Sequence, residues 1–243
     1  MSQQQENQAS NDAAVIRTVG LRKLYTTEDV ETTALDNVNI EIGSGEFVAI
    51  MGPSGCGKST LLNLLGLLDN PSAGEYWLLG EEVATSSERR RANMRKGAIG
   101  FVFQSFNLID ELTVYENVEL PLLYLGMSGK DRRERVNAIL DHMQITHRQK
   151  HFPQQLSGGQ QQRVAVARAV VGQPKLILAD EPTGNLDSTH GDEVMGMLTQ
   201  LNESGTTVAM VTHSPAYADF AHRVIHLFDG QVVTENIMKE RGH

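Results

Sequence analysis

The sequence predicts an α/β fold with a mostly parallel β-sheet, and three observations favour this class. An apolar run at 47–51 leads through a glycine-rich loop into a helix-favouring run at 61–65. Further short apolar runs, separated by segments of helical pattern, lie at 175–179, 206–211 and 224–228. Leucines at helical spacing, with no β alternation, mark 113–144 as a helical insertion. Such alternation of strands and helices is typical of a parallel sheet that is covered on both faces.

The elements follow in order after a polar tail. Residues 1–13 are rich in Gln, Asn and Ser, so we expect them to be disordered and the ordered chain to be a single domain at 14–243. We expect strands at 15–19, 34–42, 46–51 and 75–79, and the apolar runs at 175–179, 206–211 and 224–228 should be strands as well. The helix after the glycine-rich loop should reach about residue 69, the charged stretch 86–96 should be a solvated helix, and Asp229-Gly230 should close a terminal hairpin.

The composition excludes several classes of function. The formal net charge is −9 and the isoelectric point is near 5.4, so there is no basic excess to neutralise a nucleic-acid backbone. The single cysteine excludes an internal disulfide framework and a cysteine-based zinc site, which favours a reducing compartment. No apolar run approaches the roughly 18 residues of a membrane-spanning helix. We therefore expect a cytoplasmic protein that does not bind nucleic acid.

The glycine-rich loop has the pattern of a phosphate-binding loop. Its residues, which we call the phosphate loop, are Gly52, Pro53, Ser54, Gly55, Cys56, Gly57, Lys58, Ser59 and Thr60. Glycines let backbone N–H groups surround an anion, and the N-terminus of the following helix adds partial positive charge. Lys58 can reach the β- and γ-phosphates, and the Ser59 hydroxyl can ligate Mg²⁺. The loop therefore predicts a nucleoside triphosphate with Mg²⁺ as ligand.

A pair of carboxylates, Asp180 and Glu181, follows the apolar run at 175–179. The end of such a strand lies at the carboxyl edge of the sheet, where open α/β sheets bind ligands, and thus beside the phosphate loop. Asp180 can hold Mg²⁺ through its water, and Glu181 can orient or deprotonate the attacking water. Two acids after a strand are ordinarily a solvated loop, but their occurrence with a phosphate loop favours phosphoryl transfer.

A second pair of glycines opens another predicted helix. Ser157, Gly158, Gly159 and Gln160 precede the helical run at 161–169. A helix N-terminus without bulky side chains can bind phosphate closely, but the phosphate loop already serves one face of the nucleotide. The simplest explanation is that this second N-terminus serves a nucleotide held by another copy of the chain. With Leu156, these residues read L-S-G-G-Q, and the chain resembles the ATP-binding cassette (ABC) family, whose signature this is.

The resemblance covers nearly all of the ordered chain and implies further site residues. Tyr25 resembles the aromatic residue that stacks on adenine, although a lone tyrosine before a strand is more often a packing residue. Gln104 matches the glutamine that contacts Mg²⁺ and the attacking water, and His213 matches the histidine that contacts the γ-phosphate. Asp187 lies in a loop, 183–187, that resembles the one touching the opposite active site.

Taken together, the resemblance implies ATP and Mg²⁺ as ligands and a role for each site residue. The catalytic residues would be Glu181, His213, Gln104 and Lys58, and the Mg²⁺ ligands would be Ser59, Gln104 and Asp180. The remaining ATP contacts would come from the phosphate loop, Tyr25, Asp187 and residues 157–160. The implied fold is a P-loop NTPase (RecA-like) core, at about 14–103 and 173–237, with an antiparallel β subdomain and an inserted α-helical subdomain at about 104–172.

Four segments narrow the resemblance to the macrolide-exporter and lipoprotein-release group of transporters, namely 45–55, 66–69, 101–108 and 179–187. This group implies an ATP-sandwich homodimer on the cytoplasmic face of the inner membrane, bound to an integral membrane permease, with a periplasmic adaptor as a further option. Phe106 and Tyr115 are candidates for holding a short helix of that permease.

Two alternatives of another class stay open from the sequence. A soluble cassette ATPase of DNA repair or translation generally carries a coiled-coil insertion, a zinc module or a second cassette, none of which the sequence shows. An ATP sensor without turnover is disfavoured by the intact Glu181.

Overall fold

The structure, a computed structural model, describes residues 14–26 and 31–237, so the tail expected at 1–13 lies outside the described residues. The strands are β1 (Ala14–Thr26), β2 (Glu31–Gly43), β3 (Phe47–Met51), β4 (Ala73–Leu78), β5 (Glu81–Glu82), β6 (Ile99–Phe103), β7 (Leu176–Asp180), β8 (Thr207–Val211), β9 (Arg223–Phe228) and β10 (Gln231–Ile237). The α-helices are α2 (Lys58–Leu65), α3 (Glu88–Ala98), α4 (Val114–Tyr124), α5 (Gly129–His142), α6 (Gly158–Val170), α7 (Ser188–Glu203) and α8 (Pro215–Ala218). This order confirms the predicted α/β class.

A six-stranded sheet, in the order β10-β9-β3-β8-β7-β6, forms the centre of the molecule. Strands β9, β3, β8, β7 and β6 are parallel, and β10 adds an antiparallel edge through the hairpin predicted at Asp229-Gly230. Successive residues of a strand face opposite sides. Accordingly, Phe47 and Ala49 belong to one hydrophobic core, and Val48 and Ile50 belong to the other. Strands β3, β7 and β8 are therefore largely apolar because both of their faces are covered.

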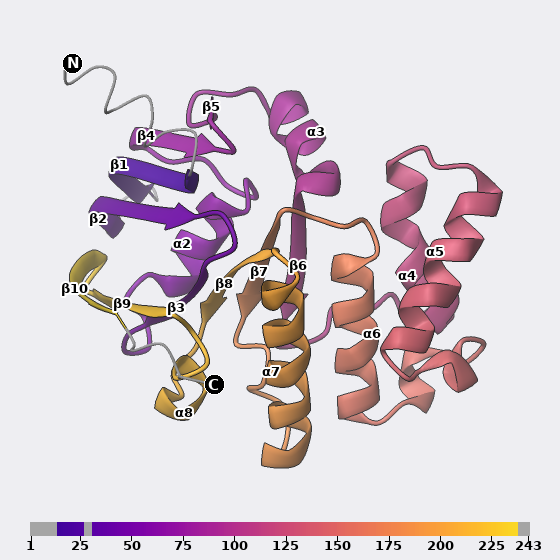
Figure 1. The fold of residues 1–243 in the computed structure, drawn as a ribbon. Helices are drawn as coiled ribbons and strands as arrows, with labels where there is room; N and C mark the ends of the chain where they lie inside the picture. The colour runs from indigo at the N-terminus through magenta and orange to yellow at the C-terminus, as the bar shows by residue number, and fades with distance from the viewer. Residues whose placement is uncertain (1–13, 27–30, 238–243) are drawn as a thin grey trace.

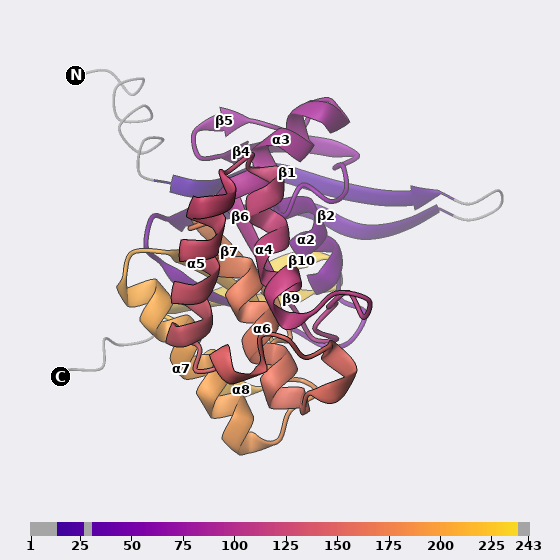
Figure 2. The ribbon, with the colours of Figure 1, turned by 90° about the vertical axis from the view of Figure 1, so that its right-hand side faces the viewer.

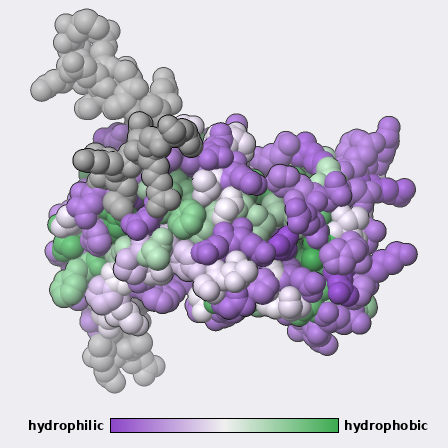
Figure 3. Space-filling model, turned by 60° about the horizontal axis from the view of Figure 1, so that its bottom comes forward, coloured by the Kyte–Doolittle hydropathy of each residue, from purple (hydrophilic) through white to green (hydrophobic). Residues whose placement is uncertain are grey.

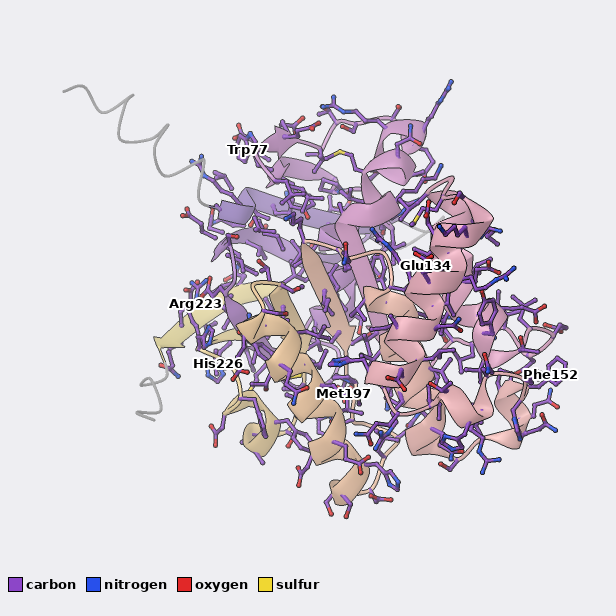
Figure 4. All side chains as sticks on the ribbon, turned by 45° about the vertical axis from the view of Figure 1, so that its right-hand side comes forward. Trp77, Glu134, Phe152, Met197, Arg223 and His226 are labelled. Atoms are coloured by element: carbon purple, nitrogen blue, oxygen red, sulfur yellow. The ribbon has the colours of Figure 1, made fainter. Side chains whose placement is uncertain are left out.

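A second sheet, in the order β2-β1-β4-β5, is antiparallel and covers one of these faces together with α2. Figure 2 shows the β1–β2 hairpin as a long projection from the body of the molecule. Arg17 of β1 lies over the ring of Trp77, 5.0 Å from its centroid, and Figure 4 shows Trp77 at this sheet. The antiparallel β subdomain implied by the resemblance is thus present.

The opposite face of the central sheet is covered by helices, including α6 and α7. Figure 1 shows α4, α5 and α6 side by side at the end of the molecule away from β10, and α4 contacts both of the other two. Their shared core includes Val118 of α4, Leu140 of α5 and Val164 of α6, all fully buried. The inserted helices are as expected, while the subdomain boundaries at 104 and 172 stay a prediction.

Arg223 ties the two sheets together at the β10 edge. Its guanidinium forms ion pairs with Glu46 at 2.8 Å and with Glu235 of β10 at 2.6 Å, and it also donates to the Glu41 carbonyl of β2. Figure 4 shows Arg223 at this edge. Because the three partners lie in different segments, Arg223 fixes the antiparallel sheet against the central one.

Several elements differ from their predicted bounds. Helix α2 ends at Leu65 rather than near residue 69, because Gly66 caps it and Leu67 is left-handed, with a φ of 56°. The helical insertion expected at 113–144 contains two helices, α4 and α5, which are separated at Gly126 (φ 70°) before Ser128 caps α5. Strand β6 was not expected as a strand, since its five residues follow the charged helix α3 directly.

Candidate functional site

The phosphate loop leads from β3 into α2, as predicted. Gly57 is the residue before the helix and has a φ of 101°, a conformation that residues with a side chain rarely adopt. At Gly52, an added Cβ would lie 2.1 Å from the Leu227 carbonyl oxygen, so only glycine fits there. Pro53, Ser54 and Gly55 are exposed, which leaves the outer surface of the loop open to a ligand. The loop is therefore packed against Leu227 on one side and exposed to solvent on the other.

Lys58 is buried inside this loop. Its ammonium donates hydrogen bonds to the carbonyl oxygens of Gly52 and Pro53, both at 2.8 Å, and lies 3.9 Å from Cys56 Sγ. Cys56 is only 5% exposed, and its carbonyl accepts a hydrogen bond from the Gly230 N–H at 3.1 Å. Ser59 and Thr60 lie in the first turn of α2. The β9–β10 turn thus supports the loop and its lysine from the side away from solvent.

The sheet register brings the other predicted groups to the same edge. Asp180, the last residue of β7, lies opposite Phe103 of β6 and Val211 of β8. Val211 in turn lies opposite Ile50 of β3, just before the phosphate loop. Since all four strands are parallel, the residues that follow them, including Gln104, Glu181 and His213, leave the sheet at one edge.

Asp180 lies in a charged and partly buried environment next to the loop. Burial raises the pKa of its carboxyl, and the nearby charge of Glu181 raises it further. A hydrogen bond from Ser59 and the charge of Lys58 act in the opposite direction without cancelling the rise. A buried carboxylate of this kind gains stability from an additional cation.

Glu181 has an unusual backbone and a defined partner. Its φ of 46° is left-handed, which for a residue with a side chain costs about 1–3 kcal/mol and occurs most often at functional sites. Its N–H donates to the Val211 carbonyl at 3.0 Å, and its carboxylate is bound to His213 Nδ1. His213 itself is exposed, with 68% of its side chain accessible. The pair therefore reaches outward from the sheet edge.

Gln104 joins this edge to the loop at 183–187. Its side-chain amide donates to Asn185 Oδ1 at 3.2 Å, and the Asn185 amide donates back to the Gln104 carbonyl at 3.0 Å. An added Cβ at Gly184 would lie 2.7 Å from the Gln104 amide nitrogen, so the two segments are in close contact. Gln104 is exposed, so its side chain is accessible to a ligand.

The signature residues lie elsewhere on the same chain. Ser157 caps α6 in a capping box with Gln160, and Gly159 is so close to α7 that an added Cβ would meet the His190 ring at 2.3 Å. A pocket of about 290 Å³ is lined by Ser157, Gly159 and Gln160 with residues of α7, and no residue of the phosphate loop lines it. The structure therefore does not bring the signature and the phosphate loop of one chain together.

Asp187 and Tyr25 have local partners. Asp187 caps α7 by accepting from the His190 N–H at 3.0 Å and is bound to His190 Nδ1 at 2.7 Å. The Tyr25 hydroxyl donates to Asp69 at 3.2 Å, and the Tyr25 residue is 43% exposed. Both residues are accessible, as ligand contacts require.

Three residues of this region were missed from the sequence. Arg168 of α6 donates to the carbonyls of Phe106 and Asn107, at 2.9 and 2.5 Å, and both of those residues are left-handed. His190 and Asn185 make the contacts described above. Only the i, i+3 spacing of Asp187 and His190 could have indicated a pair, because the other contacts join residues far apart in sequence.

Magnesium fits the donors at this edge if phosphate oxygens and waters complete its shell. Among residues 14–26 and 31–237, no group of three or more His, Cys, Asp and Glu side chains could hold a metal ion. Mg²⁺ is usually bound through one or two carboxylates plus substrate phosphates, and the Ser59–Asp180 pair matches that pattern.

Comparisons with known proteins agree with this geometry. The family model described as "ABC transporter" matches residues 35–184. An ABC transporter ATP-binding protein of Methanocaldococcus jannaschii, MJ1508, is 51% identical over 211 residues, which are 87% of this chain and 94% of that protein. A macrolide export ATP-binding/permease protein, MacB 1/2 of Paracoccus denitrificans, is 47% identical over 93% of this chain, which spans only 34% of that longer protein.

Solved structures show the same fold. A dimeric structure of the ATP-binding cassette MJ0796 in a post-hydrolysis state with ADP and Pi superposes with a TM-score of 0.86 at 45% identity, covering 92% of this chain and 99% of that one. The structure of cbiO1 from Clostridium perfringens, part of an ABC transporter complex, superposes with a TM-score of 0.82 at 29% identity, covering 94% and 90% of the two chains. The chain therefore belongs to the ABC transporter family, as an ATP-binding subunit with the fold of its ATPases.

Proposed function

We propose that two copies of this chain bind two ATP molecules with Mg²⁺ between them and that ATP-driven closure powers a separate membrane subunit of the macrolide-exporter or lipoprotein-release type. The observation that carries the proposal is the meeting of Lys58, Asp180, Glu181, Gln104 and His213 at one sheet edge, while Ser157 and Gly159 of the same chain lie apart from it. The signature helix that completes the site would then come from a second copy.

Each residue at the edge has a task that its surroundings support. The phosphate loop and Lys58 would bind the β- and γ-phosphates, and Lys58 would exchange its carbonyl partners for phosphate oxygens. Mg²⁺, held by Ser59, Asp180 and Gln104, would neutralise charge that develops on the phosphates. Glu181 would take a proton from the attacking water or orient it, and His213, bound to Glu181, would contact the γ-phosphate.

The second copy would supply its signature helix. At the N-terminus of α6, Ser157 is exposed and Gly158 is half-buried, while Gly159 is buried against α7. This N-terminus would bind the γ-phosphate of the facing subunit. A two-fold axis gives each copy both roles, because residue i of one chain then contacts residue j of the other and the reverse. Asp187, exposed at the start of α7, would contact the opposite site.

A membrane permease is the proposed partner. The relatives with a MacB name are described as ATP-binding/permease proteins, and this chain matches about a third of their length. Among the described residues, none forms a helix long and apolar enough to cross a membrane. A separate permease would therefore bring the chain to the cytoplasmic face of the inner membrane, and a periplasmic adaptor could complete the complex. Neither a DNA-repair nor a translation ATPase, nor an ATP sensor, is favoured by these relatives.

A groove beside Gln104 is the proposed contact for that partner. It has a volume of about 330 Å³ and runs between the end of α3, β6, α4 and α6. Its apolar lining includes Phe101, Phe103, Leu120 and Leu125. Phe106 and Tyr115, the anchors expected from the sequence, do not line it, and both are half-buried. The anchoring role of Phe106 and Tyr115 stays a prediction, and we propose the groove residues as further anchors.

The substitution Glu181→Gln tests the proposed chemistry. It removes the proton acceptor while keeping the size of the side chain, so ATP hydrolysis should fall by about 10²–10⁴-fold, the usual contribution of a general base. Binding of MgATP, measured by equilibrium titration, should be retained. Near-normal turnover in this variant would contradict the assignment of Glu181.

A further inference from the structure

Two charged residues surround the Tyr25 side chain on the β1–β2 hairpin. Lys23 and Tyr25 are two residues apart on β1, a spacing that puts both side chains on one face of a strand. The Lys23 ammonium lies 4.9 Å from the centroid of the Tyr25 ring. It donates to Asp69 Oδ1 and to the Asn70 carbonyl, both at 2.7 Å, and the Tyr25 hydroxyl donates to Asp69 Oδ2 at 3.2 Å. We call Lys23, Tyr25 and Asp69 the tyrosine clamp.

The burial of its members shows that the tyrosine clamp is a built arrangement. Lys23 is only 8% exposed, and a lysine so far removed from water requires charged or polar partners. Burial by itself would raise the pKa of Asp69. Hydrogen bonds from Lys23, from the Asn70 N–H and from Tyr25 outweigh it and hold that pKa below its ordinary value. The Asp69 carboxyl is therefore ionised at neutral pH and available to the Lys23 ammonium.

Tyr25, in contrast, remains accessible. The residue is 43% exposed, although one side of its ring faces the Lys23 ammonium and its hydroxyl is bound. An aromatic ring that has two such partners and is still open to solvent has less rotamer freedom to lose when a ligand binds. Such preorganisation strengthens binding because less freedom is lost in the complex.

The hairpin places the tyrosine clamp next to the phosphate loop. Across the β1–β2 pair, Lys23 lies opposite Leu35 and Tyr25 lies opposite Thr32. Leu35 and its neighbour Ala34 touch the phosphate loop, since an added Cβ at Gly57 would lie 2.5 Å from the Ala34 carbonyl oxygen. Tyr25 is therefore exposed on a hairpin whose second strand touches the phosphate loop.

We propose that Lys23 and Asp69 are positioning residues for the nucleotide base: they hold the Tyr25 ring so that its free face is ready to stack on adenine. The inference rests on the proposed function, in which ATP binds at the phosphate loop. Asp69 acts on both partners, because one carboxylate oxygen binds the ammonium behind the ring and the other binds the hydroxyl at its edge. The ammonium adds a cation–π contact to the face that adenine does not use.

The test compares two ligands, MgATP and inorganic tripolyphosphate, which has the phosphate chain and no base. Tyr25→Ala should weaken MgATP binding by about 5- to 150-fold, the range for loss of one base–aromatic stack. Lys23→Met and Asp69→Asn should each weaken it by about 2- to 10-fold through lost preorganisation. Tripolyphosphate affinity, measured by competition, should stay at the wild-type value in all three variants.

A double variant separates positioning from a merely structural role. When Tyr25 is already alanine, adding Lys23→Met should cause almost no further loss of MgATP affinity, since Lys23 acts through the ring. Arg22→Met is the matched control: Arg22 is the adjacent residue, is exposed and pairs with Asp36 on the same hairpin. It should bind both ligands like the wild type.

Each contrary result has a distinct meaning. Unchanged MgATP affinity in Tyr25→Ala would overturn the stacking contact and this inference with it, while Glu181→Gln still tests hydrolysis independently. A loss in Tyr25→Ala without a loss in Lys23→Met and Asp69→Asn would overturn the inference alone. An equal loss for tripolyphosphate, or additive losses in the double variant, would show that the variants disturb the fold and would also overturn it.

Discussion

Asp180 and Glu181 are neighbours in sequence, yet their surroundings suit them to different tasks. Asp180 ends β7 inside the sheet register and faces Ser59 and Lys58 of the phosphate loop. Glu181 turns away with a left-handed backbone and meets His213 instead. Separating two carboxylates in this way allows one to hold a cation while the other handles a proton.

The raised pKa of Asp180 makes a prediction about stability. The pKa of Asp180 is higher in the folded chain than in the unfolded chain, so folding disfavours its ionised form. The free energy of unfolding therefore falls as the pH rises above the pKa that Asp180 has in the unfolded chain. Asp180→Asn should therefore raise the Tm of the ligand-free chain at about pH 7.5, with the gain shrinking towards about pH 4, where the unfolded carboxyl is protonated. Thermal unfolding of both proteins across this range measures the difference.

The same substitution should reduce hydrolysis, because it removes the carboxylate assigned to Mg²⁺. A lower Tm than the wild type at every pH would contradict the cause given for the pKa shift, and unimpaired hydrolysis would contradict the Mg²⁺ role.

Cys56 offers a chemical test of the phosphate loop. It is the single cysteine of the chain, and its side chain is almost fully buried beside Lys58. A maleimide added to its sulfur has no room unless the loop is displaced, so alkylation should abolish most ATP hydrolysis. Bound MgATP should slow the reaction by holding the loop closed, and Cys56→Ser should be insensitive to the reagent. Equal inhibition of Cys56→Ser would show that the thiol is not the target.

At the scale of elements, the strands could be predicted from the sequence because the pattern that marks them also forms the core. The apolar run at 208–211, for example, is uninterrupted since both faces of a central strand are buried. The candidate residues at strand ends were found for the same reason, because a motif after such a run must lie at the sheet edge. Strand β6 was missed because five residues after a charged helix carry too little pattern to be distinguished from a loop.

Contacts between elements could not be predicted. The tyrosine clamp joins residues 46 positions apart, and Arg168 binds carbonyls 61 and 62 positions away. No periodicity in one sequence relates such positions. The same holds for the groove beside Gln104, whose lining comes from four elements and differs from the anchors expected at Phe106 and Tyr115.

The groove yields a prediction for the membrane partner. Leu125 lines it and is 37% exposed, whereas the adjacent Tyr124 is 65% exposed and lies outside the lining. Leu125→Asp should leave ATP hydrolysis by the isolated chain intact and weaken stimulation by the reconstituted permease. The free energy of binding to the permease should fall by about 2 kcal/mol or more, as for an anchor residue that is buried in an interface. Tyr124→Asp is the control and should respond normally. Full stimulation of the Leu125→Asp variant would exclude this groove.

At the scale of the whole molecule, the surface bears on how two copies could meet. Figure 3 shows hydrophilic side chains over much of the face turned to the viewer, with hydrophobic groups mainly in small patches. Figure 4 shows Phe152, which is 43% exposed, at the end of the molecule away from the central strands. Residues 53–55 of the phosphate loop and Ser157 of the signature are exposed as well, as contact between two copies requires.

Because the signature and the phosphate loop of one chain lie apart, the claim that two copies form each active site can be tested. Without hydrolysis, the ATP-bound pair should persist, so Glu181→Gln with MgATP should accumulate as a dimer. A bulky cation at the N-terminus of α6 should block the facing phosphate loop, and Ser157→Arg is therefore the matched disruption; Ser157 is exposed, so the fold should tolerate it.

The most direct measurement is the molar mass in solution, by light scattering, of Glu181→Gln with and without MgATP. The account predicts a monomer mass without nucleotide, twice that mass with MgATP, and no increase when Ser157→Arg is added to the same chain. A mass that does not respond to MgATP, or a dimer that persists in the double variant, would contradict the claim that each active site is completed by the signature helix of a second copy.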